Sequence, residues 1–123
     1  MGHGVLDIAG VRVLFCDPDG PPVATERDGT DLIGDAMGEG AGWIAIPVAR
    51  LSDDFLKLST GLAGAILQKA VNYRINIAIV GDVSAQMAAS KPLNDFVGES
   101  NCGRHVWFVD SLDALRARLT PST

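Results

Sequence analysis

The stretch "LSTGLAGAILQKAVNYRINIAIVGD", residues Leu58 to Asp82, decides the fold because it joins an amphipathic helix directly to a buried strand. The run "INIAIVG" is rich in β-branched residues and ends at Gly81, as expected of a strand buried on both faces. At about 100° per residue, the apolar residues of the preceding helix share one half of its surface. These residues are Leu62, Ala63, Ile66, Leu67, Ala70 and Val71. A helix that packs on a sheet and leads into a buried strand indicates an α/β fold.

The residues on either side of this stretch extend the pattern. "GVLDIAGVRVLFC" predicts two antiparallel strands, about 5–8 and 11–16, with a tight turn between them. A helix from Asp28, a buried strand in "WIAIPV" and a helical turn in "DFLKL" follow. Beyond the opening stretch we expect a helix from Ser90, a strand in "HVWFV" and a helix capped by Ser111. The order predicts a single α/β domain over residues 1–123, with an N-terminal β-hairpin and a mainly parallel sheet covered by helices.

Composition narrows the class of partner. The chain has 123 residues, of which 47% are hydrophobic and 20% charged, and this suits one soluble globular domain. A formal net charge of −5 without a basic stripe argues against binding to nucleic acid or to a membrane surface. Cys16 and Cys102 form no CxxC motif, and no secretory segment is visible. We therefore expect a cytoplasmic protein.

The helix carries a second face opposite its apolar half. Gly61, Gly64, Ala65, Gln68 and Asn72 gather there, so this face is both small and polar. The simpler interpretation is that the two amides are solvated or cap the helix end. The alternative is an interaction face for a protein partner or for a second copy in a homodimer.

Ser59 and Thr60 stand where this helix is expected to begin. A hydroxyl at that position accepts hydrogen bonds from free backbone N–H groups, and the same helix end favours negative charge. Two interpretations stay open. The hydroxyls form a simple helix cap, or they mark a site where a phosphate is bound or covalently attached.

The segment "STGLAGAIL", which follows a strand and a short loop, is similar to the phosphorylation-site segment of STAS domains, the anti-sigma-factor antagonist fold. In that family a kinase that is also an anti-sigma factor phosphorylates one of a pair of hydroxyls. The resemblance implies a STAS-like fold, with Ser59 and Thr60 as the candidate hydroxyls and Gly61 as the matching glycine. Leu58 stands where STAS domains usually carry an aspartate.

A second resemblance covers nearly the whole chain. "FLKLSTGLAGAILQKAVNYRINIAIVGD" and "LNDFVGESNCG" look like the uncharacterised bacterial domain-of-unknown-function family 4180. Ala65 replaces an acidic residue expected from that family. The resemblance marks a set of positions as candidates for an interaction or ligand face: Gln68, Asn72, Tyr73, Glu99, Ser100, Asn101 and Gly103.

The segment "GESNCGRH" is expected to end the helix that begins near Ser90. Gly98, Asn101 and Gly103 tolerate left-handed backbone conformations and so indicate a helix stop and a loop. A functional alternative is a polar loop in which residues 99–101 meet the amides of Gln68 and Asn72 across neighbouring helices.

Loops at the carboxyl ends of the parallel strands are expected to share one edge of the sheet, where open α/β sheets bind ligands. "ARLSDDFLKLST" and "GDVSAQ" are two of these loops. Asp53, Asp54 and Asp82 lie in them. Solvated loop residues are the simpler interpretation, since no positioned histidine accompanies them; the alternative is an enzyme in which these aspartates or Glu99 supply acid and base groups, or a site where they hold a divalent cation. We expect no cofactor. The sequence therefore predicts a noncatalytic STAS-like regulatory or protein-interaction module, with a small-molecule or anion binder at the strand ends as the alternative.

Overall fold

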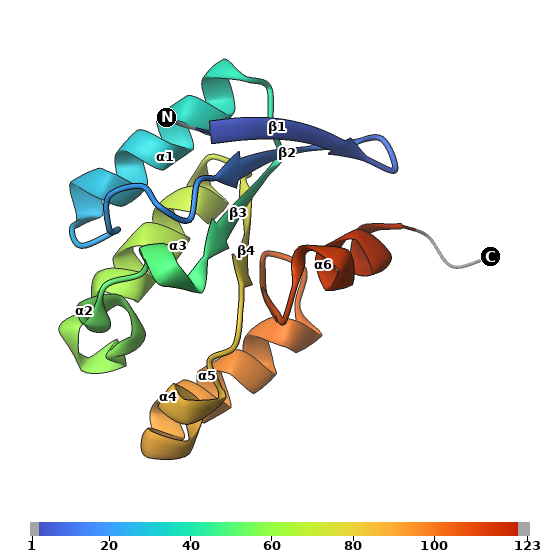
Figure 1. Cartoon of the computed structure of the whole chain (residues 1–123). Coiled ribbons are helices and arrows are strands. Elements are labelled where there is room, and N and C mark those ends of the chain that lie inside the picture. The colour runs from blue at the N-terminus through green and yellow to red at the C-terminus, as the bar shows by residue number, and fades with distance from the viewer. Residues whose placement is uncertain (1–2, 121–123) are drawn as a thin grey trace.

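The computed structural model describes residues 3–120 and contains one five-stranded sheet with helices on both faces (Figure 1). The strands are β1 (His3–Ile8), β2 (Val11–Cys16), β3 (Trp43–Pro47), β4 (Asn76–Val80) and β5 (Val106–Val109). They lie in the sheet in the order β1-β2-β3-β4-β5, so every strand pairs with its neighbours in the chain. The first pair is antiparallel and the other three are parallel. The predicted α/β class with a mainly parallel sheet is confirmed.

The helices are α1 (Glu26–Gly38), α2 (Asp53–Leu56), α3 (Leu62–Asn72), α4 (Ser84–Ala89), α5 (Lys91–Cys102) and α6 (Leu112–Leu119). Two short 3-10 turns, η1 (Val48–Arg50) and η2 (Leu58–Thr60), lie in the connection between β3 and α3. Within residues 3–120, none of the helices has the length and apolar character that crossing a bilayer requires.

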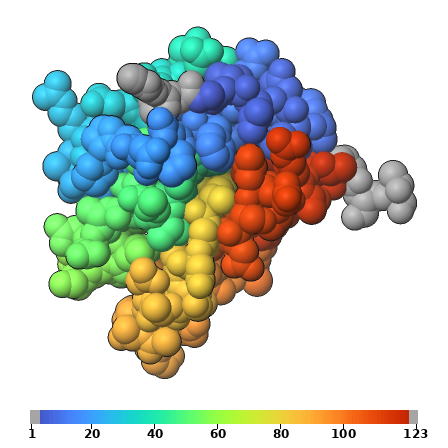
Figure 2. Space-filling view, in the orientation of Figure 1, coloured from blue at the N-terminus to red at the C-terminus, as the bar shows by residue number. Residues whose placement is uncertain are grey.

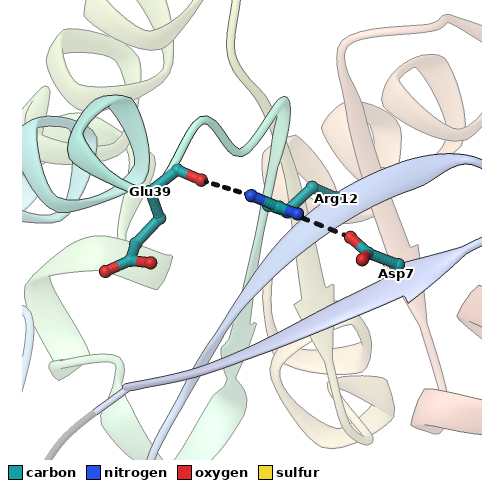
Figure 3. A network of polar contacts seen from close by, with 3 residues as sticks. All are labelled: Asp7, Arg12 and Glu39. Carbon is teal, nitrogen blue, oxygen red and sulfur yellow. Dashed lines mark hydrogen bonds and ion pairs between the residues drawn. The ribbon is translucent and has the colours of Figure 1, made fainter.

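The predicted N-terminal hairpin is present, and its turn explains its register. Ala9 and Gly10 both have positive φ, 51° and 85°, the conformation that matches the right-handed twist of two antiparallel strands. The register pairs Ile8 with Val11 next to the turn. Arg12 then ties the hairpin to the end of α1, because its Nε donates to Asp7 and its Nη1 donates to the backbone carbonyl of Glu39, both at 3.1 Å (Figure 3).

The larger core lies between the sheet and the helices α1 and α3, with Phe96 of α5 packed against it. Alternate residues of the central strands supply it, as the two-residue period of a strand requires. They are Leu14 and Cys16 of β2, Ile44 and Ile46 of β3, and Ile77 and Ile79 of β4. Because the strands follow the chain across the sheet, crossovers of one hand place successive helices on the same face.

The smaller core lies on the opposite face, where α6 packs. Trp43, Ala45, Ala78 and Val109 of the sheet surround the fully buried Leu115 of α6. In Figure 2 a yellow strip, the colour of β4 and of the residues that follow it, separates α6, in red, from the green segment that follows β3. The centre of β4 is buried, but Phe15, Val80 and Trp107, which pack on this smaller core, are only partly buried. One helix therefore covers only part of this face.

Several predicted boundaries differ from the structure. The segment after β4 forms the short helix α4, where a loop was expected. The helix from Ser90 ends at Cys102, inside the segment predicted to end it, but its C-cap Gly103 has an ordinary φ of −94° and not a left-handed conformation. On α3, Val71 is 36% exposed although the apolar pattern placed it against the sheet.

Candidate functional site

The carboxyl ends of the parallel strands carry the two hollows that involve the predicted loops. One lies beside α1, between the loop after β2 and the segment after β3. The other lies between the α2–η2 segment and the α4–α5 segment. Both therefore occur where successive crossovers leave the sheet, the edge at which open α/β sheets bind ligands.

The hollow beside α1 has a volume of about 560 Å³. Its lining includes five aspartates and one arginine: Asp17, Asp19, Asp28, Asp31, Asp35 and Arg50. The loop after β2 is held in place by a parallel bridge between Val23 and Leu51. The N–H of Val23 donates to the carbonyl of Arg50, and the N–H of Ser52 donates back to the carbonyl of Val23. This bridge places Arg50 against the loop that follows β2.

Among the residues that the structure describes, Arg50 is the one charged residue that is buried, with 6% of its surface exposed. Its Nε donates to the carbonyl of Pro21 at 2.5 Å and its Nη1 to the carbonyl of Asp17 at 2.9 Å. Gly20 packs so closely on the guanidinium that a Cβ there would lie 2.7 Å from Nη1. The arginine thus organises the loop through main-chain carbonyls that a proline-rich segment cannot satisfy by regular pairing.

Asp28 is a fixed negative charge on the wall of this hollow. Its Oδ2 accepts from the N–H groups of Ala24 and Thr25, and the Thr25 hydroxyl accepts from the Asp28 N–H to complete a capping box. The hydrogen bond from Ala24, followed by that from Thr25, holds the pKa of Asp28 below its usual value against the effect of partial burial. The carboxylate stays ionised at neutral pH.

The second hollow, of about 300 Å³, contains Ser59. Lys57 and Ser59 line it from one side, and Gln86, Ser90 and Leu93 line it from the other. Ser59 is exposed, so its hydroxyl is open to a ligand or to a modifying enzyme.

Thr60 differs from its neighbour. Its hydroxyl donates toward the carbonyls of Asp54 and Lys57, at 2.7 and 2.9 Å, and accepts from the N–H of Leu62 at 3.3 Å. The hydroxyl pair does not start the helix directly. Both residues belong to η2, and Gly61 is the N-cap of α3 with a φ of 78°, a left-handed conformation that favours glycine.

The small polar face of α3 points away from the sheet. Gly61, Gly64, Gln68 and Asn72 are all exposed. Nε2 of Gln68 donates to Oδ1 of Asn72 at 3.1 Å, so the two amides pair with each other one helical turn apart. Tyr73, which caps the helix, is 52% exposed.

The other predicted positions lie elsewhere. Glu99, Ser100 and Asn101 occupy the last turns of α5, where Glu99 is exposed and the other two are partly buried. Helix α5 packs on β5 and α4, whereas α3 packs on α1, α2 and β4. The expected polar loop is therefore helical, and its hydrogen bonds do not run to Gln68 and Asn72.

Asn101 and Gly103 connect α5 to the end of the chain. Oδ1 of Asn101 accepts from the N–H of Phe108 at 2.7 Å, and the Asn101 carbonyl accepts from Arg118 of α6. The carbonyl of Gly103 accepts from Nε1 of Trp107 at 2.9 Å, and the Arg118 guanidinium lies 4.1 Å from the centre of that indole ring. These contacts give both residues a structural role at the junction of α5, β5 and α6.

The remaining acidic candidates are dispersed. Asp53 and Asp54 lie in the first turn of α2 and are exposed. Oδ1 of Asp82 accepts from the N–H of Ser84, and hydrogen bonding by Ser84 lowers the pKa of Asp82. Between residues 3 and 120, no group of three or more His, Cys, Asp or Glu side chains is arranged to hold a metal ion.

Arg50 and the aspartates of α1 were not predicted from the sequence as members of one hollow. The available signal was weak: a Pro-Pro pair after a strand indicates a loop without ladder hydrogen bonds, and such a loop requires other donors. Arg50 and these aspartates come together because of the bridge between Val23 and Leu51, which are 28 positions apart in the chain. No local sequence pattern specifies a pairing over that distance.

Comparison with known proteins gives one assignment. Neither the curated proteins nor the solved structures contain a match to this sequence. The family model described as Domain of unknown function (DUF4180) matches residues 8–119, which span the sheet from the end of β1 to the last residue of α6. The chain therefore belongs to the DUF4180 family.

Proposed function

We propose that the protein is a noncatalytic regulatory or protein-interaction module of STAS-like type, in which Ser59 receives a phosphate or faces a bound anion. The observation that carries this proposal is the contrast between two adjacent hydroxyls. Ser59 is exposed and lines a hollow, whereas the Thr60 hydroxyl is committed to main-chain groups of η2 and α3. A modifying enzyme can reach the first without disturbing the backbone.

The order of elements supports the comparison with STAS domains. A hairpin precedes alternating helices and strands, and "STGL" lies between a buried strand and an amphipathic helix. The first turn of α3 contains no acidic side chain. Its partial positive charge therefore favours an anion nearby, by about 0.3 to 1 kcal/mol for an exposed helix end.

The proposed modification uses ATP and a partner kinase. Oγ of Ser59 attacks the γ-phosphorus of ATP, the bond to the leaving ADP breaks, and the hydroxyl proton passes to the kinase base. The phosphoserine adds a charge of about −1.5 to −2 at neutral pH. Lys57, on the same wall of the hollow, supplies a positive charge close to that site.

The exposed face of α3 is the proposed contact surface. Gly64 leaves space for a partner's backbone, Gln68 and Asn72 offer amide groups, and Tyr73 adds an aromatic ring of the kind enriched at interfaces. A phosphate at Ser59, near the start of the same helix, would change the charge at one end of this surface. The partner is a protein kinase or a second copy of the chain, in the cytoplasm.

The test uses purified protein incubated with ATP and a lysate of the source organism, followed by intact-mass measurement and peptide mapping. We expect the mass increment of one phosphate, located on Ser59. The increment should disappear in Ser59→Ala and persist in Thr60→Ser, which keeps the hydroxyl of η2. A phosphate on Thr60, or no increment with the wild-type protein, would contradict the phosphorylation switch.

A further inference from the structure

Strand β1 forms one outer edge of the sheet, and among residues 3–120 no further strand lies beyond it (Figure 1). An edge strand presents backbone N–H and C=O groups to other chains, and proteins commonly protect it with a proline, a lysine or a bulge. Residues 3–8 contain neither proline nor lysine, and their pairing with β2 is continuous from His3 to Ile8. The acidic residue of the strand, Asp7, forms an ion pair with Arg12 at 3.1 Å. These common devices therefore do not protect β1.

The register of the hairpin decides which backbone groups of β1 point outward. The two residues that flank a two-residue turn exchange both hydrogen bonds, and bonded pairs then alternate with non-bonded pairs. Asp7 and Arg12 therefore form a non-bonded pair. The carbonyl of Arg12 agrees with this alternation, since it accepts at 3.0 Å from the N–H of Gly42, which directly precedes β3. The N–H and C=O groups of Val5 and Asp7 consequently point away from β2, at the open edge.

The opposite edge of the sheet, formed by β5, is protected. The carbonyl of Val109 accepts from the N–H of Gly81 at the end of β4, so the N–H of the adjacent Phe108 points outward. That N–H donates to Oδ1 of Asn101 at 2.7 Å. A side chain of α5 thus takes the outward donor that a further strand would need, and β1 is the edge that remains open to pairing.

Exposed apolar side chains accompany the open edge of β1. Val5 is 39% exposed and lines a hollow of about 360 Å³ together with Gly34 and Gly38 of α1. A Cβ added at either glycine would meet no atom within 4 Å. Met37, which lies between these glycines in the chain, is 53% exposed. The edge therefore offers apolar surface and free space in addition to backbone hydrogen bonds.

We propose that β1 pairs with β1 of a second copy of the chain, antiparallel and about a twofold axis, so that the two sheets become one. Hydrogen bonds form only between positions whose groups point outward, which in β1 are the odd-numbered positions 3, 5 and 7. The register that uses all of them places Val5 opposite Val5 of the second copy, on the axis, and position 3 opposite Asp7. Directly opposite residues share a face of the sheet, so the two exposed valines cover each other.

A second copy fits this edge because it brings the same spacing of outward groups and the same exposed valine, as a self-complementary twofold interface requires. The proposal goes beyond the proposed function, since it concerns β1 and neither Ser59 nor α3. The exposed face of α3 then stays open for the partner kinase.

The experiment is sedimentation velocity of the full chain from low micromolar to millimolar concentration, where we expect an equilibrium between monomer and dimer. Val5→Lys should raise the dissociation constant by about ten-fold or more, because two like charges would face each other across the axis. Val5→Glu should do the same. An equal mixture of the two variants should form a dimer again, since opposite charges then face each other. A folding defect in either variant would not give this recovery.

Val71→Lys on α3 is the matched control, because Val71 is 36% exposed and so resembles Val5 in exposure. It should leave the dissociation constant unchanged. Amide hydrogen exchange gives a measurement for single residues. The N–H groups of Val5 and Asp7 should exchange more slowly as the protein concentration rises, whereas that of Leu6, which points toward β2, should be protected at every concentration.

The proposal is overturned if the wild-type protein stays monomeric at every concentration, or if the mixed Val5 variants stay monomeric. It is also overturned if Val71→Lys dissociates the dimer and Val5→Lys does not, because the second copy would then lie on α3. Ser59→Ala separates this interface from the proposed phosphorylation site, since Ser59 lies in η2. Its dimerisation should equal that of the wild type, whatever the outcome of the phosphorylation experiment.

Discussion

Oδ1 of Asn101 accepts a hydrogen bond from the backbone N–H of Phe108 at 2.7 Å, so the last turn of α5 holds a residue of the edge strand β5. Without this bond, the partly buried N–H of Phe108 would lack an acceptor. Phe96 of α5 also packs edge-on against the Phe108 ring, with centroids 6.0 Å apart. Together, the hydrogen bond and the ring contact join the last turns of α5 to β5.

Asn101→Ala should lower the free energy of unfolding by about 1 to 3 kcal/mol, because it leaves a partly buried donor unsatisfied. Asn101→Asp retains an acceptor and should lose less. Asn94→Ala, at an exposed position of the same helix, is the control and should change stability little. Urea unfolding followed by circular dichroism measures all three. Equal losses in Asn101→Ala and Asn94→Ala would exclude the proposed role of the bond.

Gly29→Ala should destabilise the contact between α1 and α3. A Cβ at Gly29 would lie 2.6 Å from Cγ1 of Ile66, in the buried centre of that contact. Overpacking of this kind costs about 1 to 3 kcal/mol. Gly34→Ala lies on the same helix with open space around its Cβ and should stabilise by up to about 1 kcal/mol through helix propensity. Thermal unfolding of the two variants should therefore shift in opposite directions.

Arg50→Lys should destabilise the loop after β2, although the substitution preserves the positive charge. An ammonium cannot reproduce the arrangement in which Nε and Nη1 donate to Pro21 and Asp17. We expect a loss of about 3 to 6 kcal/mol if both charge-assisted bonds are lost, at about 1.5 to 3 kcal/mol each. Hydrogen exchange should report faster exchange of the Val23 N–H, which donates to the Arg50 carbonyl. Unchanged protection there would contradict the organising role of Arg50.

Cys16 should make stability fall at high pH. Burial raises the pKa of its thiol to about 11 in the folded chain, against 9.0 for the unfolded thiol, while Arg50 partly opposes the shift. Below pH 9.0 both states keep the proton; between 9.0 and about 11 the unfolded state loses it first. Stability contributed by this group should therefore decline over that window, by on the order of 2 kcal/mol.

Cys16→Ala provides the comparison for this pH dependence, because other groups titrate in the same range. The difference between the wild-type and variant unfolding free energies should shrink as the pH rises through the window. Thiol labelling gives a second measurement. Exposed Cys102 should react with iodoacetamide in the native protein, whereas buried Cys16 should react only after unfolding. A parallel pH dependence in both proteins would refute the assignment to Cys16.

Local signals in the sequence predicted most of the fold. Ala9 and Gly10 specify the turn of the hairpin, β-branched residues specify β4, and the hydroxyls of Ser90 and Ser111 cap their helices. Each of these features depends on residues a few positions apart. The sequence pattern therefore contains the information that the chain needs to form them.

The parts that were not predicted depend on distant contacts. Helix α4 has six residues, no side-chain cap and no buried residue, so its pattern resembles a loop. Residues 99–101, considered as a polar loop, are instead the last turn of α5, which the bond of Asn101 joins to β5. The position of Arg50 depends on pairing between Val23 and Leu51. Tertiary packing outweighed local propensity at each of these places.

The strand order β1-β2-β3-β4-β5 bears on how the chain assembles. In a sheet of this order, each new strand joins the edge formed by the strand before it, and no strand must be inserted between two that have already paired. Each step closes only the loop of one crossover, which keeps the entropic barrier low. We therefore expect growth of the sheet from the hairpin toward the C-terminus, in step with synthesis on the ribosome.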